Sequence, residues 1–368
     1  MLKGSIRGYA VAVKRIPWHS VTLAAREIDI FMKADDHPNI IRYFYHEVQL
    51  DFIYVAIQLY HASLADIIER SDNFKEISDA FEPKRALHEI TSGLRYLHAC
   101  KIIHRDIKPQ NILVSGAKNG EHHRMLISGF GLSMRLEVYQ TSFMPTNSRA
   151  TARAGTDGWR APEILWKSKL GSSGASHGRA ATPNAMKLAK AVDIFALGCL
   201  FYYCLTGGLQ LDNDWVSIVE DLEELEELGE ESIEAVNLME KMLNPEASLR
   251  YVEQRFLSVD SYCISRPDTT SCLIHPFFWN AEQRLAFLQD VSDKFEAMRE
   301  DPCREEDLVA LETNARSVFG RNWMIQLDEP FEDFLVKKRE YDCGSVQDLL
   351  RALRNGVSRP RYRSCAGG

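Results

Sequence analysis

Eight consecutive residues, from His104 to Asn111, constrain the fold of this chain more than any other stretch. They read His-Arg-Asp-Ile-Lys-Pro-Gln-Asn and lead into the apolar run Ile-Leu-Val, which predicts a strand. An acid, a cation and an amide oxygen close together on one loop suit the transfer of a phosphoryl group to a hydroxyl. Asp106 would orient the hydroxyl proton, Lys108 would neutralise the transferred group, and Asn111 would offer an amide oxygen to a metal ion. Lys108 favours serine or threonine over tyrosine as the acceptor.

This loop resembles the catalytic loop of eukaryotic protein kinases. The resemblance implies an α+β, bilobal fold with an antiparallel-sheet N-lobe and a mostly helical C-lobe, and it implies ATP or ADP and Mg²⁺ as cofactors. Val-Ala-Val-Lys at residues 11–14 resembles the kinase strand whose lysine bridges the nucleotide phosphates, which gives this role to Lys14. Glu27, on a predicted helix over residues 23–33, is its expected ionic partner.

Further segments also resemble kinase motifs. A strand over residues 54–59 is predicted to lead into the hinge between the lobes, where backbone groups of Leu59, Tyr60 and His61 would meet adenine. Helical periodicity over residues 83–99 predicts a core helix. Asp193 matches the aspartate that anchors the backbone of the catalytic loop, and Gly-Thr-Asp-Gly-Trp at residues 155–159 resembles a substrate-docking loop.

Two expected kinase elements depart from the pattern. No G-x-G-x-x-G precedes Lys14, because Gly4 and Gly8 do not have that spacing. We therefore expect the N-lobe sheet to be truncated at its start, with a first strand and the glycine loop lying before residue 1. In addition, Gly129 stands where a metal-binding aspartate belongs, and glycine has no ligand atom. Phosphoryl transfer should fall on the order of a hundredfold or more, and the residue is either a natural divergence or the product of a single-base change.

The segment between Gly129 and the Ala-Pro-Glu signal at 161–163 carries candidate phosphorylation sites. Arg149 and Arg153 are interleaved with hydroxyl groups there, so a phosphate could order the segment by pairing with arginine. The candidates are Ser142, Thr146, Ser148 and Thr151. A plain polar loop is the alternative. Residues 166–190 include the stretch Gly-Ser-Ser-Gly-Ala-Ser-His-Gly, so we interpret them as a surface insertion.

The C-terminal part resembles a second domain. His-Pro-Phe-Phe-Trp at 275–279, the helix pattern at 282–293 and Gly-Ser-Val-Gln-Asp-Leu-Leu-Arg-Ala-Leu-Arg-Asn at 344–355 resemble the α-helical kinase-extension nuclease domain. That domain follows the kinase in unfolded-protein-response sensors of the inositol-requiring-enzyme type and, more distantly, in ribonuclease L. We predict a kinase domain over 1–279 (N-lobe 1–59, C-lobe 60–279) and a nuclease domain over 280–368 that is C-terminally truncated.

The resemblance implies a kinase that autophosphorylates in trans, forms back-to-back homodimers or higher oligomers, and activates a metal-independent endoribonuclease. The nuclease would cut a stem-loop mRNA in unconventional splicing, at the cytosolic face of the endoplasmic reticulum membrane. Its carried-over residues are Tyr341, Arg354 and Asn355; for Arg354 a solvated helix charge is the alternative. The family's catalytic histidine, expected soon after Asn355, is not found.

Composition limits the remaining possibilities. A net charge of −8 argues against nonspecific binding of nucleic acid by the whole surface. The 8 cysteines show no C-x-x-C pair, which fits a reducing compartment. No apolar run reaches the roughly 18 residues of a membrane span, so we expect a membrane anchor to lie outside this chain.

Two segments interrupt the family pattern. Residues 251–265 separate Arg250 from the expected Arg-Pro continuation, and residues 356–368 replace the end of the nuclease domain. Both can be encoded by splice-donor-like codons, so both are candidate retained introns; a real surface insertion is the alternative for the first. Three hypotheses remain: an active kinase coupled to a nuclease, a nucleotide-binding pseudokinase scaffold, and a truncated product without function.

Overall fold

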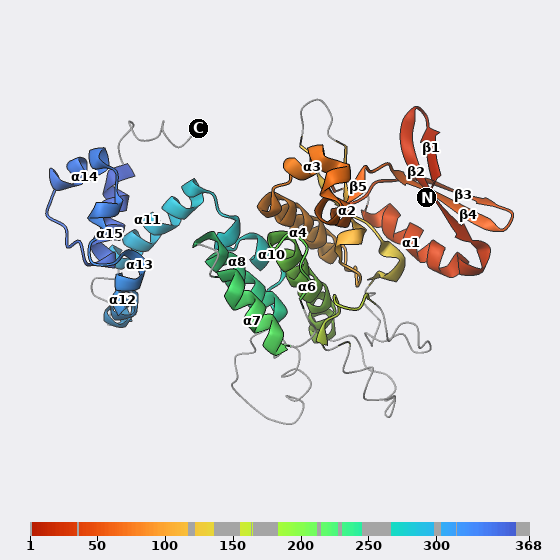
Figure 1. Cartoon of the computed structure of the whole chain (residues 1–368). Coiled ribbons are helices and arrows are strands. Elements are labelled where there is room, and N and C mark those ends of the chain that lie inside the picture. The colour runs from red at the N-terminus through yellow and green to blue at the C-terminus, as the bar shows by residue number, and fades with distance from the viewer. Residues whose placement is uncertain are drawn as a thin grey trace, which may run out of the picture. The chain divides into compact units, whose positions relative to one another are not determined.

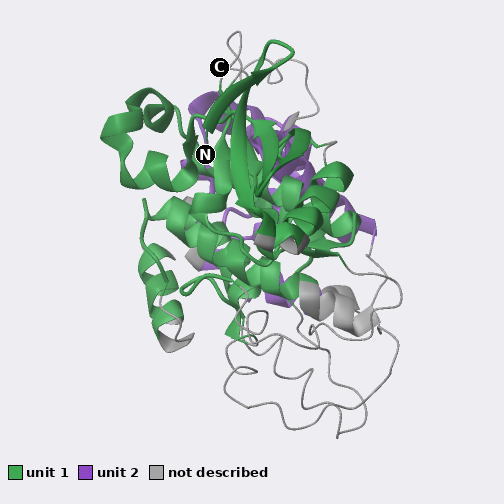
Figure 2. Ribbon diagram, turned by 90° about the vertical axis from the view of Figure 1, so that its right-hand side faces the viewer, with its two compact units in different colours: residues 1–278 green, residues 279–368 purple. Residues whose placement is uncertain are grey.

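The computed structural model of the chain describes residues 2–34, 37–116, 122–135, 155–162, 164, 183–211, 215–226, 230–244, 266–297, 303–313 and 315–357. The chain divides into two compact units, residues 1–278 and 279–368 (Figure 2). No helix among these described residues is long and apolar enough to cross a membrane.

A four-stranded antiparallel sheet begins the first unit (Figure 1). Its strands are β1 (Leu2–Ile6), β2 (Tyr9–Pro17), β3 (Tyr43–Gln49) and β4 (Phe52–Gln58), in the order β1-β2-β4-β3. The predictions of β2 and β4 are confirmed. Strand β1 was not predicted, because Leu-Lys-Gly-Ser-Ile has no clear alternation and is largely exposed. It forms by pairing with β2 across the tight turn at Arg7 and Gly8, whose φ angles of 50° and 83° suit a two-residue hairpin turn.

Helix α1 (Val21–Ala34) confirms the helix predicted over 23–33. One face of it buries Ala24, Ile28 and Phe31, which recur at helical spacing. Glu27 lies on this same face and is only 5% exposed. A carboxylate on an apolar helix face requires a positively charged or hydrogen-bonding partner nearby.

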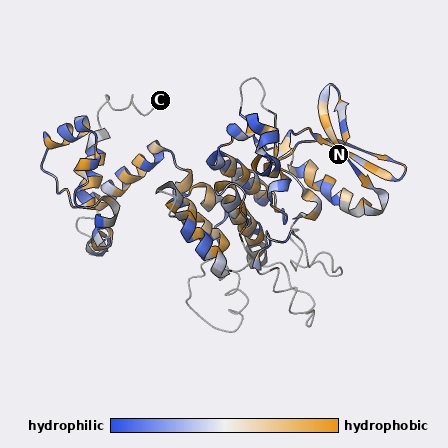
Figure 3. Ribbon diagram, viewed as in Figure 1, coloured by the Kyte–Doolittle hydropathy of each residue, from blue (hydrophilic) through white to orange (hydrophobic). Residues whose placement is uncertain are grey.

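The larger part of the first unit is helical. Its longer helices are α4 (Pro83–Ala99), α6 (Pro183–Leu205), α7 (Trp215–Glu226) and α8 (Glu230–Leu243); its shorter ones are α2 (Leu64–Glu69), α3 (Lys75–Asp79) and α10 (Thr269–Leu273). The predicted core helix α4 is confirmed, with Leu87, Ile90, Leu94 and Leu97 fully buried. Figure 3 shows hydrophobic residues gathered along the interior helices.

The observed start of helix α6 differs from the prediction. The predicted surface insertion extends to residue 190, but α6 already begins at Pro183. The residues from 183 onward read Pro-Asn-Ala-Met-Lys-Leu-Ala-Lys, in which proline at the first turn is followed by strong helix formers. The glycine and serine content of the preceding stretch concealed this helix start.

Short strands fix both ends of the segment 104–111. Before it, β6 (Ile102–Ile103) pairs with β9 (Met134–Arg135). After it, β7 (Ile112–Val114) pairs with β5 (Ala62–Ser63) and with β8 (Met125–Ile127). The strand predicted at 112–114 is confirmed, and the loop is held between two buried strands.

The second unit is helical, as predicted. Its helices are α11 (Ala281–Ala297), α12 (Cys303–Thr313), α13 (Ala315–Phe319), α14 (Glu329–Val336) and α15 (Val346–Val357). A separate hydrophobic core gathers Phe319, Trp323, Leu335, Tyr341 and Ala352. An antiparallel-sheet lobe, a helical lobe and a second, helical unit thus follow one another along the chain, in agreement with the predicted α+β class.

Candidate active sites

Lys14 on β2 and Glu27 on α1 form an ion pair. Lys14 Nζ lies 2.7 Å and 2.8 Å from the two carboxylate oxygens of Glu27. The Glu27 side chain is 7% exposed, so the lysine satisfies a charge that would otherwise be buried without compensation. The pairing expected from their spacing is confirmed, while the role of Lys14 toward a nucleotide stays a prediction.

The Asp106 carboxylate lies at the centre of a hydrogen-bond network. Its Oδ1 accepts the hydroxyl of Thr156 at 2.7 Å, and its Oδ2 accepts the Asn111 side-chain amide at 2.8 Å. Lys108 Nζ lies 3.1 Å from Asp106 Oδ2 and donates to the Thr156 hydroxyl at 2.6 Å. The side chains of Asp106, Lys108 and Asn111 therefore lie in contact, as predicted. The Thr156 hydroxyl joins them, although no role was predicted for it. Its position in the docking-loop motif was the available signal.

Asp193 of α6 anchors the backbone of the 104–111 loop, as predicted. This fully buried carboxylate accepts the backbone N–H groups of His104 at 2.8 Å and Arg105 at 2.7 Å, and it contacts His98 Nε2 at 2.9 Å. Burial alone would raise the pKa of Asp193, but these hydrogen bonds and the neighbouring histidines hold that pKa below its ordinary value. The ionised anchor fixes Arg105 in a left-handed conformation, with φ 68°.

Phe130 connects the loop to α1. Its ring centroid lies 5.2 Å from Phe31 of α1 and 5.2 Å from His104 of the loop. His104 also contacts the Ser128 carbonyl through Nε2 at 2.7 Å. Residues 128–130 are therefore held between the helix that carries Glu27 and the loop that carries Asp106.

Gly129 lies directly against Asn111. Its φ of 79° is left-handed, and a Cβ built there would meet the Asn111 side-chain amide well inside van der Waals contact. Asn111 donates to both the main-chain carbonyl and the carboxylate of Asp106. Among the described residues, no group of three or more His, Cys, Asp or Glu side chains could hold a metal ion. Gly129 supplies no ligand atom, so only the Asn111 amide remains of the two side-chain ligands that the kinase resemblance implies for Mg²⁺, and the residues present do not fit that arrangement.

The hinge candidate Leu59 directly follows β4 and is partly buried. The backbone N–H of His61, two residues later, donates to the Val114 carbonyl at 3.1 Å. The N–H of His61 is therefore already used within the protein, which corrects the expectation that it contacts adenine. Leu59 and Tyr60 stay predicted adenine contacts.

Several predictions concern residues outside the described part of the chain. They are the phosphorylation candidates Ser142, Thr146, Ser148 and Thr151, the segment 251–265, and residues 358–368. The residue after the first segment is described. Arg266 is 6% exposed and donates to the carbonyls of Asn244 at 3.2 Å and Ala191 at 3.0 Å.

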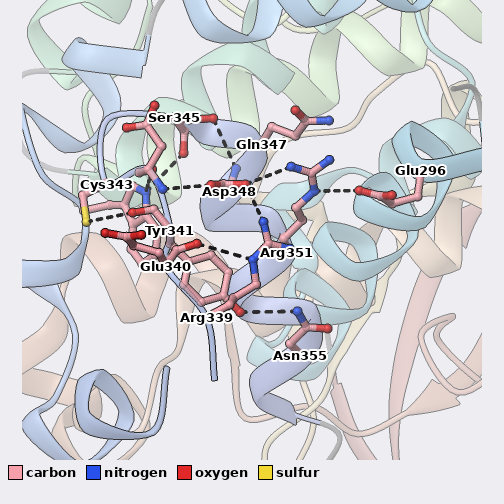
Figure 4. Close-up of polar contacts among 12 residues, drawn as sticks. Glu296, Arg339, Glu340, Tyr341, Cys343, Ser345, Gln347, Asp348, Arg351 and Asn355 are labelled. Carbon is pink, nitrogen blue, oxygen red and sulfur yellow. Dashed lines mark hydrogen bonds and ion pairs between the residues drawn. The ribbon is translucent and has the colours of Figure 1, made fainter. Parts of the chain in front are cut away.

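In the second unit, Tyr341 and Asn355 lie together (Figure 4). Asn355 Nδ2 lies 3.4 Å from the Tyr341 hydroxyl, and the Tyr341 ring packs edge-on against Trp323 at 6.1 Å. The guanidinium of Arg339 stands 5.1 Å from the centroid of the Tyr341 ring. The sequence did not indicate a role for Arg339, although it stands only two positions before Tyr341.

Arg354 pairs with a different helix. Its Nε lies 2.6 Å from Asp293 Oδ1 of α11, and both side chains are about half exposed. One helical turn earlier, Arg351 bridges Glu296 at 2.6 Å and Asp348 at 2.9 Å (Figure 4). Both arginines therefore tie α15 to α11, and the more exposed Arg354 remains the candidate for phosphate contact.

Comparison with known families agrees with this two-part architecture. Residues 4–278 match the protein kinase domain, and residues 284–359 match the ribonuclease 2-5A family. These ranges cover nearly all of the two compact units.

Similar proteins occur in fungi and animals. The chain is 38% identical to the serine/threonine-protein kinase/endoribonuclease ireA of Aspergillus fumigatus, over 96% of this chain and 32% of that protein. It is 36% identical to the sensor for unfolded proteins in the ER ire1 of Schizosaccharomyces pombe, over 96% and 32%. It is 35% identical to the serine/threonine-protein kinase/endoribonuclease IRE2 of Homo sapiens, over 96% and 35%. The chain thus spans about a third of the length of these curated relatives.

Proposed function

The chain belongs to the protein kinase family, among the kinases joined to a ribonuclease 2-5A domain, and on this premise we propose that it is the kinase and endoribonuclease part of an unfolded-protein sensor. The observation that carries the proposal is the assembled catalytic loop. Asp106 contacts Lys108, Asn111 and Thr156 in the same unit that pairs Lys14 with Glu27. A helical unit with Tyr341 beside Asn355 follows it.

Each group has a stated role in this proposal. ATP supplies the phosphoryl group, Lys14 holds its α- and β-phosphates, and Leu59 contacts adenine. Asp106 orients the acceptor hydroxyl of a serine or threonine, and Lys108 neutralises the charge that develops on the transferred group. The acceptor sites are on a second copy, at Ser142, Thr146, Ser148 or Thr151.

The partners follow from the family. Two copies pair back to back, and pairing activates cleavage of a stem-loop mRNA at the cytosolic face of the endoplasmic reticulum membrane. Tyr341, Arg354 and Asn355 contact the RNA around the cleaved bond. Because the expected histidine does not follow Asn355, we expect little cleavage by this chain as it stands.

A nucleotide-binding scaffold is the second candidate function. Gly129 favours it, since loss of the metal carboxylate weakens transfer without touching the Lys14–Glu27 pair. In this case the kinase unit promotes pairing of two copies when nucleotide is bound, and phosphoryl transfer contributes little.

An autophosphorylation assay with radiolabelled ATP separates the two candidates. The wild-type chain, a Gly129→Asp variant and an Asp106→Asn control are compared. Weak labelling of the wild type that rises in Gly129→Asp and vanishes in Asp106→Asn supports a kinase weakened at one position. No labelling of Gly129→Asp contradicts the kinase assignment, and equally strong labelling of wild type and Gly129→Asp removes the metal-ligand argument.

A further inference from the structure

The acidic side chains of the nucleotide site are already neutralised by lysines of the protein. Glu27 is paired with Lys14 at 2.7 Å, and Asp106 is paired with Lys108 at 3.1 Å. Both carboxylates are largely buried, with exposed fractions of 7% and 11%, while the side chains of Lys14 and Lys108 are 39% and 20% exposed. These two pairs place no unbalanced negative charge where the phosphates would lie.

Residue 129 would ordinarily add such a charge. A carboxylate there repels the phosphates of a bare nucleotide and attracts them once a divalent cation lies between. Binding then depends on the cation for an electrostatic reason. Glycine removes both the metal ligand and the repulsion of the phosphates. A bound Mg²⁺ therefore adds less to nucleotide affinity, and the nucleotide binds more readily when no Mg²⁺ is present.

Asn111 does not compensate for the missing ligand. Its amide nitrogen donates twice to Asp106, at 2.7 Å to the carbonyl and 2.8 Å to Oδ2. Its side-chain amide also lies in the space where a residue-129 side chain would begin. A single neutral amide oxygen against a glycine is a poor site for Mg²⁺, which prefers carboxylates and an octahedral set of oxygens.

We infer that this kinase unit binds nucleoside diphosphates and triphosphates without a divalent cation, and that Gly129 is the cause. The inference rests on the proposed nucleotide-binding function and adds its mode of regulation. Occupancy of the site, and hence pairing of two copies, would follow the nucleotide concentration and not the concentration of Mg²⁺.

Isothermal titration calorimetry of the full chain with ADP tests the inference, once with excess Mg²⁺ and once with EDTA. We expect the dissociation constant of the wild type to agree within about twofold between the two conditions. Gly129→Asp should bind at least about tenfold more tightly with Mg²⁺ than with EDTA. Aspartate tolerates the left-handed conformation better than most residues, so this variant should fold; circular dichroism checks that it does.

Gly129→Ala is the matched control. Its Cβ meets Asn111 in the same way as that of aspartate but brings no carboxylate, so its affinity should stay independent of Mg²⁺. Mg²⁺-dependent binding by the wild type overturns the inference, and loss of that dependence in Asn111→Ala would assign the metal to Asn111. Mg²⁺-independent binding by Gly129→Asp overturns residue 129 as the cause. Absence of ADP binding in every condition contradicts the proposed function itself.

Discussion

The hydroxyl of Thr156 donates to Asp106 Oδ1 at 2.7 Å, although the two residues are 50 positions apart in the chain. The same hydroxyl accepts from Lys108 Nζ at 2.6 Å. Thr156 therefore joins the acidic and the basic group of the proposed transfer reaction and sets their orientation.

Removal of this hydroxyl should slow transfer without weakening nucleotide binding. We expect Thr156→Val to lower the initial rate of phosphoryl transfer about tenfold or more, the effect of losing one hydrogen bond to a charged group. Thr156→Ser keeps the hydroxyl and should retain most of the rate. Rates are measured in the Gly129→Asp background, where we expect stronger labelling, and ADP affinity is measured alongside. Equal rates for Thr156→Val and its parent would show that the contact has no positioning role.

Loss of Lys14 should reduce nucleotide affinity. Lys14→Met removes the cation proposed for the phosphates and leaves Glu27 buried without its partner, so we expect ADP to bind at least about tenfold more weakly. Lys33→Met is the matched control, because Lys33 pairs with Asp29 on the exposed side of α1, the helix that carries Glu27. Calorimetry compares the two variants. A similar small loss in both would exclude Lys14 as the phosphate contact.

His104 should make the first unit less stable in mild acid. Burial lowers the pKa of His104 below its ordinary 6.5. The unfolded chain then binds a proton more readily than the folded one as pH falls below about 6.5, so the free energy of unfolding decreases until the folded-state pKa is passed. Above this window the imidazole is neutral in both states and has no effect.

Chemical denaturation at about pH 7 and pH 5 measures this loss in the wild type and in His104→Gln. Glutamine does not titrate and can still contact the Ser128 carbonyl, so the loss should be smaller in the variant. It should not vanish, because burial also lowers the pKa of His37, His88 and His275. An identical loss in both proteins would rule out His104 as a contributor.

Glu312 should stabilise the start of α15 in the second unit. Its carboxylate accepts the Ser345 hydroxyl at 2.7 Å and the backbone N–H groups of Val346 at 2.9 Å and Gln347 at 3.0 Å. We expect Glu312→Ala to destabilise α15 by about 1–3 kcal/mol, as for loss of a helix cap that carries charge. Hydrogen exchange of the α15 amides measures this, and Glu306→Ala, exposed on the same helix α12, is the control. Unchanged exchange in Glu312→Ala would contradict the cap.

The catalytic loop and the ion pair could be predicted from the sequence, because their functional groups lie within short segments of the chain. The segment 104–111 brings three functional groups together on one loop, and the spacing of Lys14 and Glu27 follows from a strand leading into a helix. Strand β1 was not readable, since its stability comes from β2 and not from its own pattern. The contacts of Thr156 were missed for a related reason, because they depend on how segments about 50 positions apart approach one another. Arg339 lies only two positions from Tyr341, but no motif marked it.

Gly129 shows where sequence and structure contribute different facts. The sequence alone identified the lost ligand atom. Only the structure shows that the Asn111 side chain lies against the glycine and is already hydrogen-bonded to Asp106. A missing side chain can be recognised from a motif, whereas the use of the space it leaves depends on neighbours that the motif does not contain.

The contacts of Arg266 bear on how many residues the segment before it can contain. The contact of Arg266 with the Asn244 carbonyl holds the two residues that flank 245–265 close together, and its contact with the Ala191 carbonyl fixes Arg266 to α6. The entropy lost in closing a chain between two fixed anchors grows only logarithmically with its length, by about 0.6 kcal/mol for each doubling. Deletion of residues 251–265 should therefore shift the unfolding temperature little. With Arg266 bound to the Asn244 carbonyl, the stability of the first unit should depend only weakly on how many residues connect the two anchors.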